Sequence, residues 1–183
     1  FEGAKNFAGN TIKFREDLIT LDPRNKKLGA RLIINLEKFY LSLKRLELKD
    51  SPINEYYELS HALGIAQKDM NKLQNKLFGI ECNFEELNGI DFKKGCYVGQ
   101  ENTARIKLKN KLSKRLLPIE LIEGELDQDD LIYNGEIEIG KVLIDSEYPF
   151  ALVKYLDDNF IGKNQYKSKN AKLKIEIPTW ISV

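Results

Sequence analysis

The stretch from Lys93 to Arg105, KKGCYVGQENTAR, concentrates residue types that can do chemistry. It brings lysines, a cysteine, an amide, a carboxylate and an arginine into one short segment. No ordinary amphipathic helix or strand requires this composition. The segment is therefore a candidate site, with Cys96 as its candidate catalytic residue.

Cys96 is the residue of this segment most able to react. A turn is predicted at 93–95, and a short helix is expected to begin at Cys96 and to continue through Arg105. A helix start and two nearby ammonium groups favour the nucleophilic thiolate form of a cysteine. The residues alone leave an alternative open, in which Cys96 is a small buried apolar residue and the charges are solvated.

The other polar groups of the segment could hold a ligand. Gly95 and Gly99 would let the backbone approach a ligand closely. Gln100 and Glu101 offer directional hydrogen bonds. Arg105 lies one helical turn beyond Glu101 and could pair with it or hold an anion.

The segment resembles the signature K-G-C-[FY]-x-G-Q-E-x-x-[AS]-R of the YgfZ-type folate-binding proteins, relatives of the glycine-cleavage T-protein that act in iron–sulfur cluster assembly and repair. The matching residues are Lys94, Gly95, Cys96, Tyr97, Gly99, Gln100, Glu101, Ala104 and Arg105. The corresponding stretch of the T-protein typically lacks the cysteine. The resemblance therefore favours the iron–sulfur branch over an aminomethyltransferase.

Two earlier segments extend the resemblance. DPRNKKLGARLII, which begins at Asp22, resembles the family's D-P-R-x(3,4)-L-G-x-R stretch, although the residues alone predict only a polar turn between two strands. A second alignment places Glu81 and Asn83 at the glutamate and asparagine of the family's P-x-E-x-N. The family's arginine and two of its prolines are replaced here, by Ser60, Ala66 and Gly79.

The resemblance implies tetrahydrofolate or a derivative as cofactor. The residues that it assigns to folate binding are Asp22, Arg24, Glu81, Asn83, Lys94, Gly95, Tyr97, Gly99, Gln100, Glu101 and Arg105. Glu81 would contact the pterin ring, and Cys96 would act in maturing or protecting [4Fe–4S] clusters of client enzymes. Iron–sulfur assembly proteins and client enzymes are the implied partners. The rival functions are a tetrahydrofolate-dependent aminomethyltransferase and an RNA-binding factor linked to tRNA modification.

The composition limits the choice of partners. The 183 residues are 42% hydrophobic and 31% charged with a net charge of +1, which is typical of a soluble globular protein and gives no general attraction to nucleic acid or membrane. No apolar run approaches the ~20 residues of a membrane span. Iron–sulfur clusters usually need about four thiolates, and this chain has only Cys82 and Cys96. We therefore expect no tightly bound metal, with Cys96 at most a transient cluster ligand beside ligands from a partner.

Basic residues without intervening acids run from Arg105 to Arg115. Their alternation with Ile106 and Leu108 predicts a strand with one positive face. This strand could be a solvated edge, or an anion cradle for a polyglutamylated folate tail or for RNA phosphates. The sequence disfavours RNA, because no aromatic residue interleaves with the basic ones.

The pattern of apolar residues predicts an α+β fold. Strands are expected at Thr11–Phe14 and Leu18–Leu21, followed by an amphipathic helix over 36–48 whose apolar stripe should lie in the core. A second helix should start at Ser51-Pro52 and stop at Gly64.

Beyond Arg115 the pattern is all-β. Five or six short strands with a hairpin turn at 133–136 predict a small antiparallel barrel or sandwich. The strand over 116–122 contains Pro118, so we expect it to be an edge strand or a bulged one.

The resemblance divides the chain into two parts. Residues 1–110 would be the C-terminal part of a glycine-cleavage T-protein-like folate-binding fold, and residues 111–183 the C-terminal β-barrel. Because the family is longer than this chain, an upstream portion is expected to be missing. The expected location is the bacterial cytoplasm, with the mitochondrial matrix as the alternative. The sequence leaves the oligomeric state open.

Overall fold

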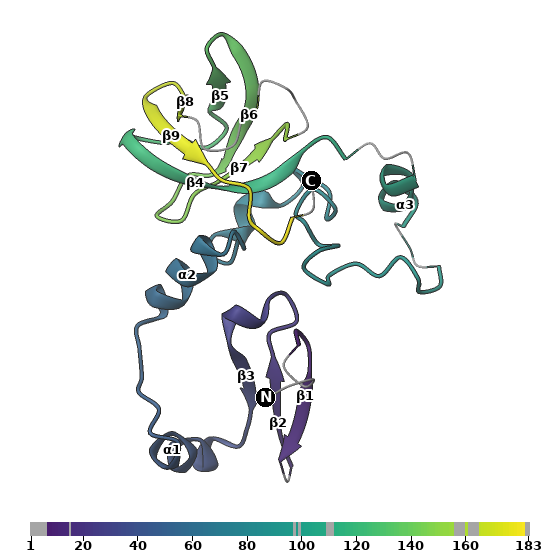
Figure 1. Ribbon diagram of the computed structural model, residues 1–183, viewed down its shortest axis with the longest axis vertical. Coiled ribbons are helices and arrows are strands. Elements are labelled where there is room, and N and C mark those ends of the chain that lie inside the picture. Colours follow the sequence, from purple (N-terminus) through teal and green to yellow (C-terminus); the bar gives the residue numbers. More distant parts are fainter. Residues whose placement is uncertain are drawn as a thin grey trace. The chain divides into compact units, whose positions relative to one another are not determined.

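The computed structural model describes residues 7–14, 16–96, 98, 100–108, 112–155, 160 and 165–181. The chain forms two compact units, Phe1–Tyr56 and Tyr57–Val183. The first holds a small sheet and the second a closed barrel, and Figure 1 labels the elements of both. The division at residue 110 that the sequence suggested stays a prediction.

The first unit is built on a three-stranded antiparallel sheet in the order β1-β2-β3. Strand β1 (Thr11–Phe14) pairs with β2 (Asp17–Leu21), and β2 pairs with β3 (Ala30–Ile33). The connection from β2 to β3 contains a short 3-10 helix, η2 (Lys26–Leu28). The two strands predicted here are thus confirmed.

Helix α1 (Leu36–Arg45) forms within the range that its apolar spacing predicts. Its first turn is capped by Asn35, whose side chain accepts a hydrogen bond from the backbone N of Glu37 at 2.8 Å. The prediction that its apolar stripe lies in the core is wrong, because none of its residues is buried; Leu41, for example, is 71% exposed. The apolar spacing gives the helix its periodicity, but the described residues place no covering layer over it.

Helix α2 (Ile53–Ala62) begins and ends where the sequence predicts. Gly64 follows it in a left-handed conformation with φ +72°. The backbone N of Gly64 donates to His61 O at 2.8 Å, and the N of Ile65 donates to Ser60 O at 2.9 Å. These two bonds satisfy the last carbonyls of the helix.

The second unit contains a closed antiparallel barrel, as the sequence predicts. Its strands are β4 (Arg115–Gly124), β5 (Leu131–Asn134), β6 (Ile137–Ile144), β7 (Phe150–Val153), β8 (Gln165–Lys167) and β9 (Ala171–Ile175). Around the barrel they follow the order β4-β7-β6-β5-β8-β9, and β9 pairs back onto β4.

Two details of the barrel differ from the prediction. The hairpin between β5 and β6 turns at Gly135 and Glu136, whereas the sequence predicts the two turn residues to be Asn134 and Gly135. Strand β4 is not an edge strand: it pairs with β7 up to Pro118 and with β9 from Ile119 onward. The proline, which has no backbone N–H, lies where β4 exchanges one partner for the other. A bulge is present in β4, but further along, between Leu121 and Glu123.

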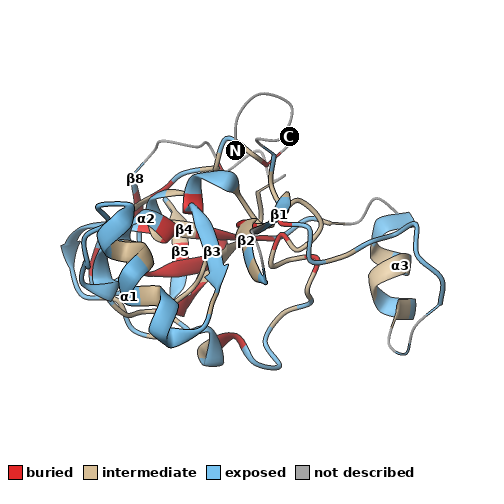
Figure 2. Cartoon of the chain, turned by 90° about the horizontal axis from the view of Figure 1, so that it is seen from below, coloured by how far each residue is buried: buried red, intermediate tan, exposed pale blue. Residues whose placement is uncertain are grey.

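The core of the second unit lies inside the barrel. Side chains with no exposed area line its interior: Leu117, Ile132, Val142, Val153 and Leu173. A second buried cluster joins Leu73 to residues of β4, β6 and β7. Figure 2 shows buried positions in the barrel strands, whereas α1 and α3 are largely exposed or intermediate. The barrel therefore gives the second unit a rigid frame for the segments attached to it.

The segment from Ile65 to Cys96 consists mainly of turns, with one 3-10 helix, η3 (Met70–Leu73). Helix α3 (Gln100–Leu108) follows. The strand predicted from Arg105 is therefore wrong as far as Leu108, because helix-forming residues at the start of this stretch outweigh the weak alternation after it. Lys109 and Lys111 lie outside the described residues.

Candidate functional site

Cys96 lies in an exposed turn ahead of α3. The turn is set by Asp91, whose side chain accepts a hydrogen bond from the backbone N of Lys93 at 2.8 Å. Gly95 has no atom within 4 Å of the position that a Cβ would take. The Cys96 side chain is exposed, so the alternative of a buried cysteine is wrong. The predicted helix begins later than expected, at Gln100.

The second cysteine has a different environment. Cys82 is half-buried, and burial, aided by the nearby charge of Glu81, raises the pKa of its thiol to about 11. The Cys82 thiol therefore stays protonated at physiological pH. An exposed thiol at Cys96 and a protonated, half-buried thiol at Cys82 make the two cysteines a natural contrast for testing.

The remaining signature residues lie on or near α3. Gln100 is half-buried in the first turn of the helix, and Glu101 and Arg105 are exposed. No ion pair between Glu101 and Arg105 is found among the described residues. Tyr97 and Gly99, both predicted to contact folate, lie outside the described residues.

Glu81 and Asn83 belong to a compact turn that rests against β4. The Glu81 carboxylate accepts a hydrogen bond from the backbone N of Phe78 through Oε2 at 2.9 Å, and its backbone O accepts one from Leu116 N at 2.8 Å. Asn83 is 2% exposed, and its Nδ2 donates to Leu116 O at 2.8 Å. Asn83 therefore fixes the turn to the barrel. Among the described residues, the second carboxylate oxygen of Glu81 has no hydrogen-bond donor.

An ion pair between a buried arginine and a half-buried glutamate, which the sequence did not reveal, secures the same turn. Arg115, whose side chain is 7% exposed, pairs through Nη1 with Glu86 Oε1 and donates to Asn83 Oδ1 at 3.1 Å. Its guanidinium also lies over the Tyr155 ring, 5.2 Å from the centroid. An arginine at the start of the apolar run LLPI is the one signal that could have predicted a buried acidic partner.

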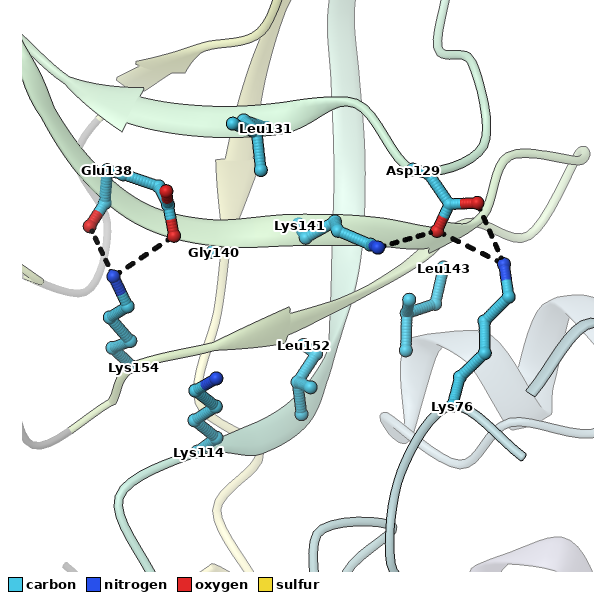
Figure 3. Close-up of a pocket in the computed structure, with 10 residues that line it drawn as sticks. All are labelled: Lys76, Lys114, Asp129, Leu131, Glu138, Gly140, Lys141, Leu143, Leu152 and Lys154. Carbon is cyan, nitrogen blue, oxygen red and sulfur yellow. Dashed lines mark hydrogen bonds and ion pairs between the residues drawn. The ribbon is translucent and has the colours of Figure 1, made fainter. Parts of the chain in front are cut away.

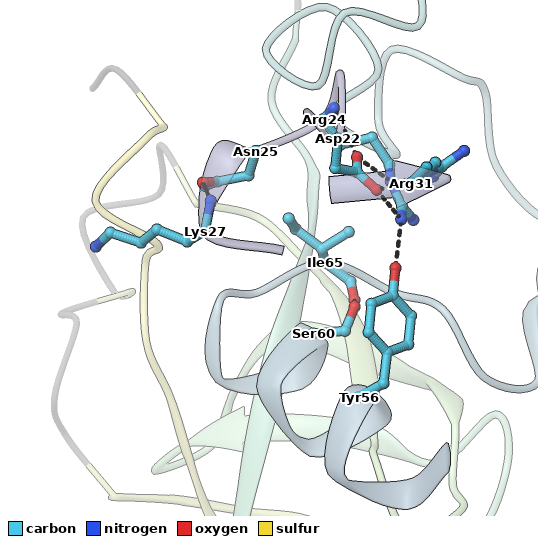
Figure 4. A network of polar contacts seen from close by, with 8 residues as sticks. All are labelled: Asp22, Arg24, Asn25, Lys27, Arg31, Tyr56, Ser60 and Ile65. Atoms are coloured by element: carbon cyan, nitrogen blue, oxygen red, sulfur yellow. Dashed lines mark hydrogen bonds and ion pairs between the residues drawn. The ribbon is translucent and has the colours of Figure 1, made fainter. Parts of the chain in front are cut away.

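The predicted folate residues of the first unit form a separate network, shown in Figure 4. Asp22 is buried, and its Oδ1 accepts hydrogen bonds from the backbone N of Arg24 at 2.9 Å and from its Nε at 3.0 Å. Its Oδ2 accepts from Arg24 Nη2 at 2.9 Å and from Arg31 Nη2 at 2.8 Å. Arg24 Nη2 also donates to Tyr56 Oη at 2.8 Å.

This network fixes the connection between β2 and β3. Burial alone would raise the pKa of Asp22, but the hydrogen bonds from Arg24 and Arg31 outweigh burial and lower it to about 2. The contacts shown are internal to the first unit, and they engage both oxygens of Asp22. The roles of Asp22 and Arg24 in folate binding stay predictions.

The sequence resemblance aligns Ser60 with an arginine of the family. Ser60 is buried, and its hydroxyl donates to Ile65 O at 2.6 Å. His61, beside it, lies near the rings of Tyr148 and Phe150, and burial lowers its pKa. Both side chains thus pack within the second unit.

Comparison with known proteins gives the chain its relatives. The iron–sulfur cluster assembly factor IBA57 homolog, mitochondrial, of Dictyostelium discoideum is 36% identical over 104 residues, which cover 55% of this chain and 25% of that protein. The protein of the same name from Neurospora crassa is 33% identical over 127 residues, which cover 69% of this chain and 28% of that protein. The mouse factor IBA57, mitochondrial, is 33% identical over 109 residues, which cover 60% and 29% of the two chains. The chain is homologous to iron–sulfur cluster assembly factors.

The homology supports the iron–sulfur branch of the resemblance, although none of the three relatives bears the name YgfZ. The matched part of the chain spans less than a third of the length of each of these relatives. All three names are mitochondrial, so they do not support the expected bacterial cytoplasm. No protein-family model matches the chain.

None of the helices in the described ranges is both long and apolar enough to cross a membrane. In the same ranges, no group of three or more His, Cys, Asp or Glu side chains is arranged to hold a metal ion.

Proposed function

We propose that this chain acts in the assembly of iron–sulfur clusters, in the mitochondrial matrix, through the thiol of Cys96. The observation that carries the proposal is the homology to mitochondrial iron–sulfur cluster assembly factors. The exposed position of Cys96 supports it, because a thiol that meets a cluster on another protein must be accessible.

The cluster would be a substrate that this chain handles and does not keep, and Cys96 would supply one ligand to it. A cluster usually takes about four thiolates, so the other ligands come from the assembly protein or the client enzyme. The exposed turn allows close approach, since Gly95 presents no side chain beside Cys96. The turn of residues 81–86 is bound to the barrel and gives the following chain, which leads to Cys96, a fixed origin.

A chimera tests the assembly role. The homologous segment of the Neurospora crassa relative is replaced by this chain, and the chimera is expressed in cells of that fungus lacking their own copy. We expect the activity of a [4Fe–4S] enzyme to return, relative to its polypeptide level, while a matrix enzyme without a cluster stays unchanged. A chimera that accumulates normally but restores no activity would contradict the assembly role.

Folate binding is a second part of the proposal. Of the two family positions in the turn, Asn83 is buried and bound to β4, so it does not fit direct contact with a pterin. Glu81 does fit, because it is half-buried and has one carboxylate oxygen without a bond to Phe78. Glu81 would hold a pterin N–H group, and the exposed guanidinium of Arg105 would hold a carboxylate of the folate tail.

Calorimetric titration with folinic acid, a stable reduced folate, tests this part. Removing the charge in Glu81→Gln should weaken binding about tenfold or more, because hydrogen bonds to charged groups contribute about 1.5–3 kcal/mol. Glu136→Gln, a matched change at an exposed turn of the barrel, should bind folinic acid like the unchanged chain. Equal affinity in both variants would remove Glu81 from the site and leave the assembly role of Cys96 standing.

A further inference from the structure

The wall of the barrel carries a groove of about 400 Å³ that the cluster chemistry does not use. We call it the lysine groove, because Lys76, Lys114, Lys141 and Lys154 line it together with two carboxylates, Asp129 and Glu138. Figure 3 shows these side chains around a floor formed by strands β5, β6 and β7.

Three of the four ammonium groups already have partners. Asp129 accepts from Lys76 at 3.0 Å and from Lys141 at 2.9 Å. Lys154 pairs with Glu138 at 3.0 Å. The groove therefore carries four positive charges against two negative ones, and the excess favours an anionic ligand.

Lys114 is the ammonium group without a partner among the described residues. It is exposed, it lies just before β4, and Figure 3 draws no contact from it to the other lining residues. A lysine that lines a groove but makes no ion pair can bind an incoming carboxylate without first losing an internal contact.

The floor of the groove is apolar. Leu131, Leu143 and Leu152 lie between the charged side chains, and Leu131 is 37% exposed. An apolar floor between separated charges suits a ligand that carries both carboxylates and aliphatic side chains.

A nucleic acid fits this groove less well. The carboxylates of Asp129 and Glu138 would repel a continuous chain of phosphates. The lining residues include no aromatic ring on which a base could stack.

We propose that the lysine groove binds an acidic segment of a partner protein in which glutamate or aspartate alternates with aliphatic residues. Lys114 pairs with one carboxylate of that segment, and an aliphatic side chain packs on Leu131 and Leu152. Because neither folate nor a cluster takes part, this binding is independent of the proposed function.

The test is fluorescence anisotropy with the whole chain and a short labelled peptide of alternating glutamate and leucine. Lys114→Glu replaces an attraction by a repulsion, so we expect it to weaken peptide binding about fivefold or more. Lys114→Arg keeps the charge and should keep the affinity. Lys49→Glu, the same change at an exposed lysine outside the groove, controls for the change in net charge and should have little effect.

The outcomes separate clearly. A loss of affinity in Lys114→Glu alone supports the proposal. The proposal is overturned if the peptide does not bind, if Lys114→Glu and Lys49→Glu weaken binding equally, or if a single-stranded RNA of equal charge binds as tightly as the peptide. Thermal unfolding followed by circular dichroism confirms that each variant is folded, as expected for exposed lysines.

Discussion

Asp22 is a buried carboxylate whose two oxygens accept hydrogen bonds from Arg24 and Arg31. Its pKa is lowered from 3.8 to about 2. The charged carboxylate therefore stabilises the fold fully at pH values above its pKa in the unfolded chain, and this contribution disappears as the pH falls through about 2. A shift of this size corresponds to about 2 kcal/mol.

Asp22→Asn should lower the free energy of unfolding by about 2 kcal/mol at neutral pH, because it removes the charge that both arginines bind. Near pH 2 the difference between the variant and the unchanged chain should shrink. Urea unfolding at the two pH values measures both differences. The same difference at both pH values would show that the charge of Asp22 is not what stabilises this turn.

The buried Arg115 pairs with the half-buried Glu86 at the base of the turn that holds Glu81. Arg115→Met leaves the half-buried Glu86 carboxylate without its partner, which should cost about 3 kcal/mol. The double variant Arg115→Met, Glu86→Leu removes both charges and should recover much of that loss. Denaturant unfolding measures the stability of both variants. If the double variant is no more stable than Arg115→Met, the stability lost in Arg115→Met does not come from breaking the ion pair.

At the scale of elements, two glycines of the barrel have positive φ but different surroundings. Gly124, at the end of β4, has φ +88°, and a Cβ there would lie 1.8 Å from Asn170 O. Gly135, in the β5–β6 turn, has φ +62° and no atom within 4 Å of that position.

Both Gly→Ala variants should be less stable than the unchanged chain, since alanine is strained at positive φ. Gly135→Ala should cost about 1 kcal/mol for this strain alone. Gly124→Ala adds a collision with backbone, so its loss should be clearly larger and should lower the melting temperature of the barrel further. Equal melting temperatures would contradict the close approach of β4 to Asn170.

The elements also show what local pattern can predict. Turn and cap residues such as Gly64 and the Asn134-Gly135 pair located the end of α2 and the β5–β6 hairpin within a residue, because they act through local backbone geometry. The start of α3 and the three-residue strand β8 were missed. Such short elements carry too few periodic residues to be distinguished from their surroundings.

At the scale of the whole molecule, the two units differ in how much apolar core they contain. Buried apolar side chains fill the barrel, whereas residues 7–13 and 16–56 of the first unit bury only Leu21 and Leu28. Stability against local opening follows the amount of buried apolar surface.

The backbone amides should therefore fall into two classes of hydrogen-exchange rate. Backbone amides of β4, β6, β7 and β9 should exchange slowly, and those of β1, β3 and α1 should exchange fast, because little apolar surface is lost when they open. Mass spectrometry of peptic fragments measures the two classes. Equal protection in both units would contradict the unequal core.

The candidate site was only partly predictable for a related reason. The exposed Cys96 turn follows from local residues, whereas Asn83 and Arg115 meet across 32 positions of sequence. Such contacts are decided by packing, which no local pattern records. Asn83, which the resemblance assigns to a ligand, hydrogen-bonds the backbone of Leu116, and its role in folate binding stays a prediction.

The central claim, that Cys96 is the working thiol, is tested most directly by exchanging each cysteine for serine in the chimera with the Neurospora crassa relative. Cys82→Ser is the matched control, because the Cys82 thiol is half-buried and stays protonated. We predict that Cys82→Ser restores [4Fe–4S] enzyme activity and that Cys96→Ser, at equal protein level, restores little or none. Full restoration by Cys96→Ser would contradict the account.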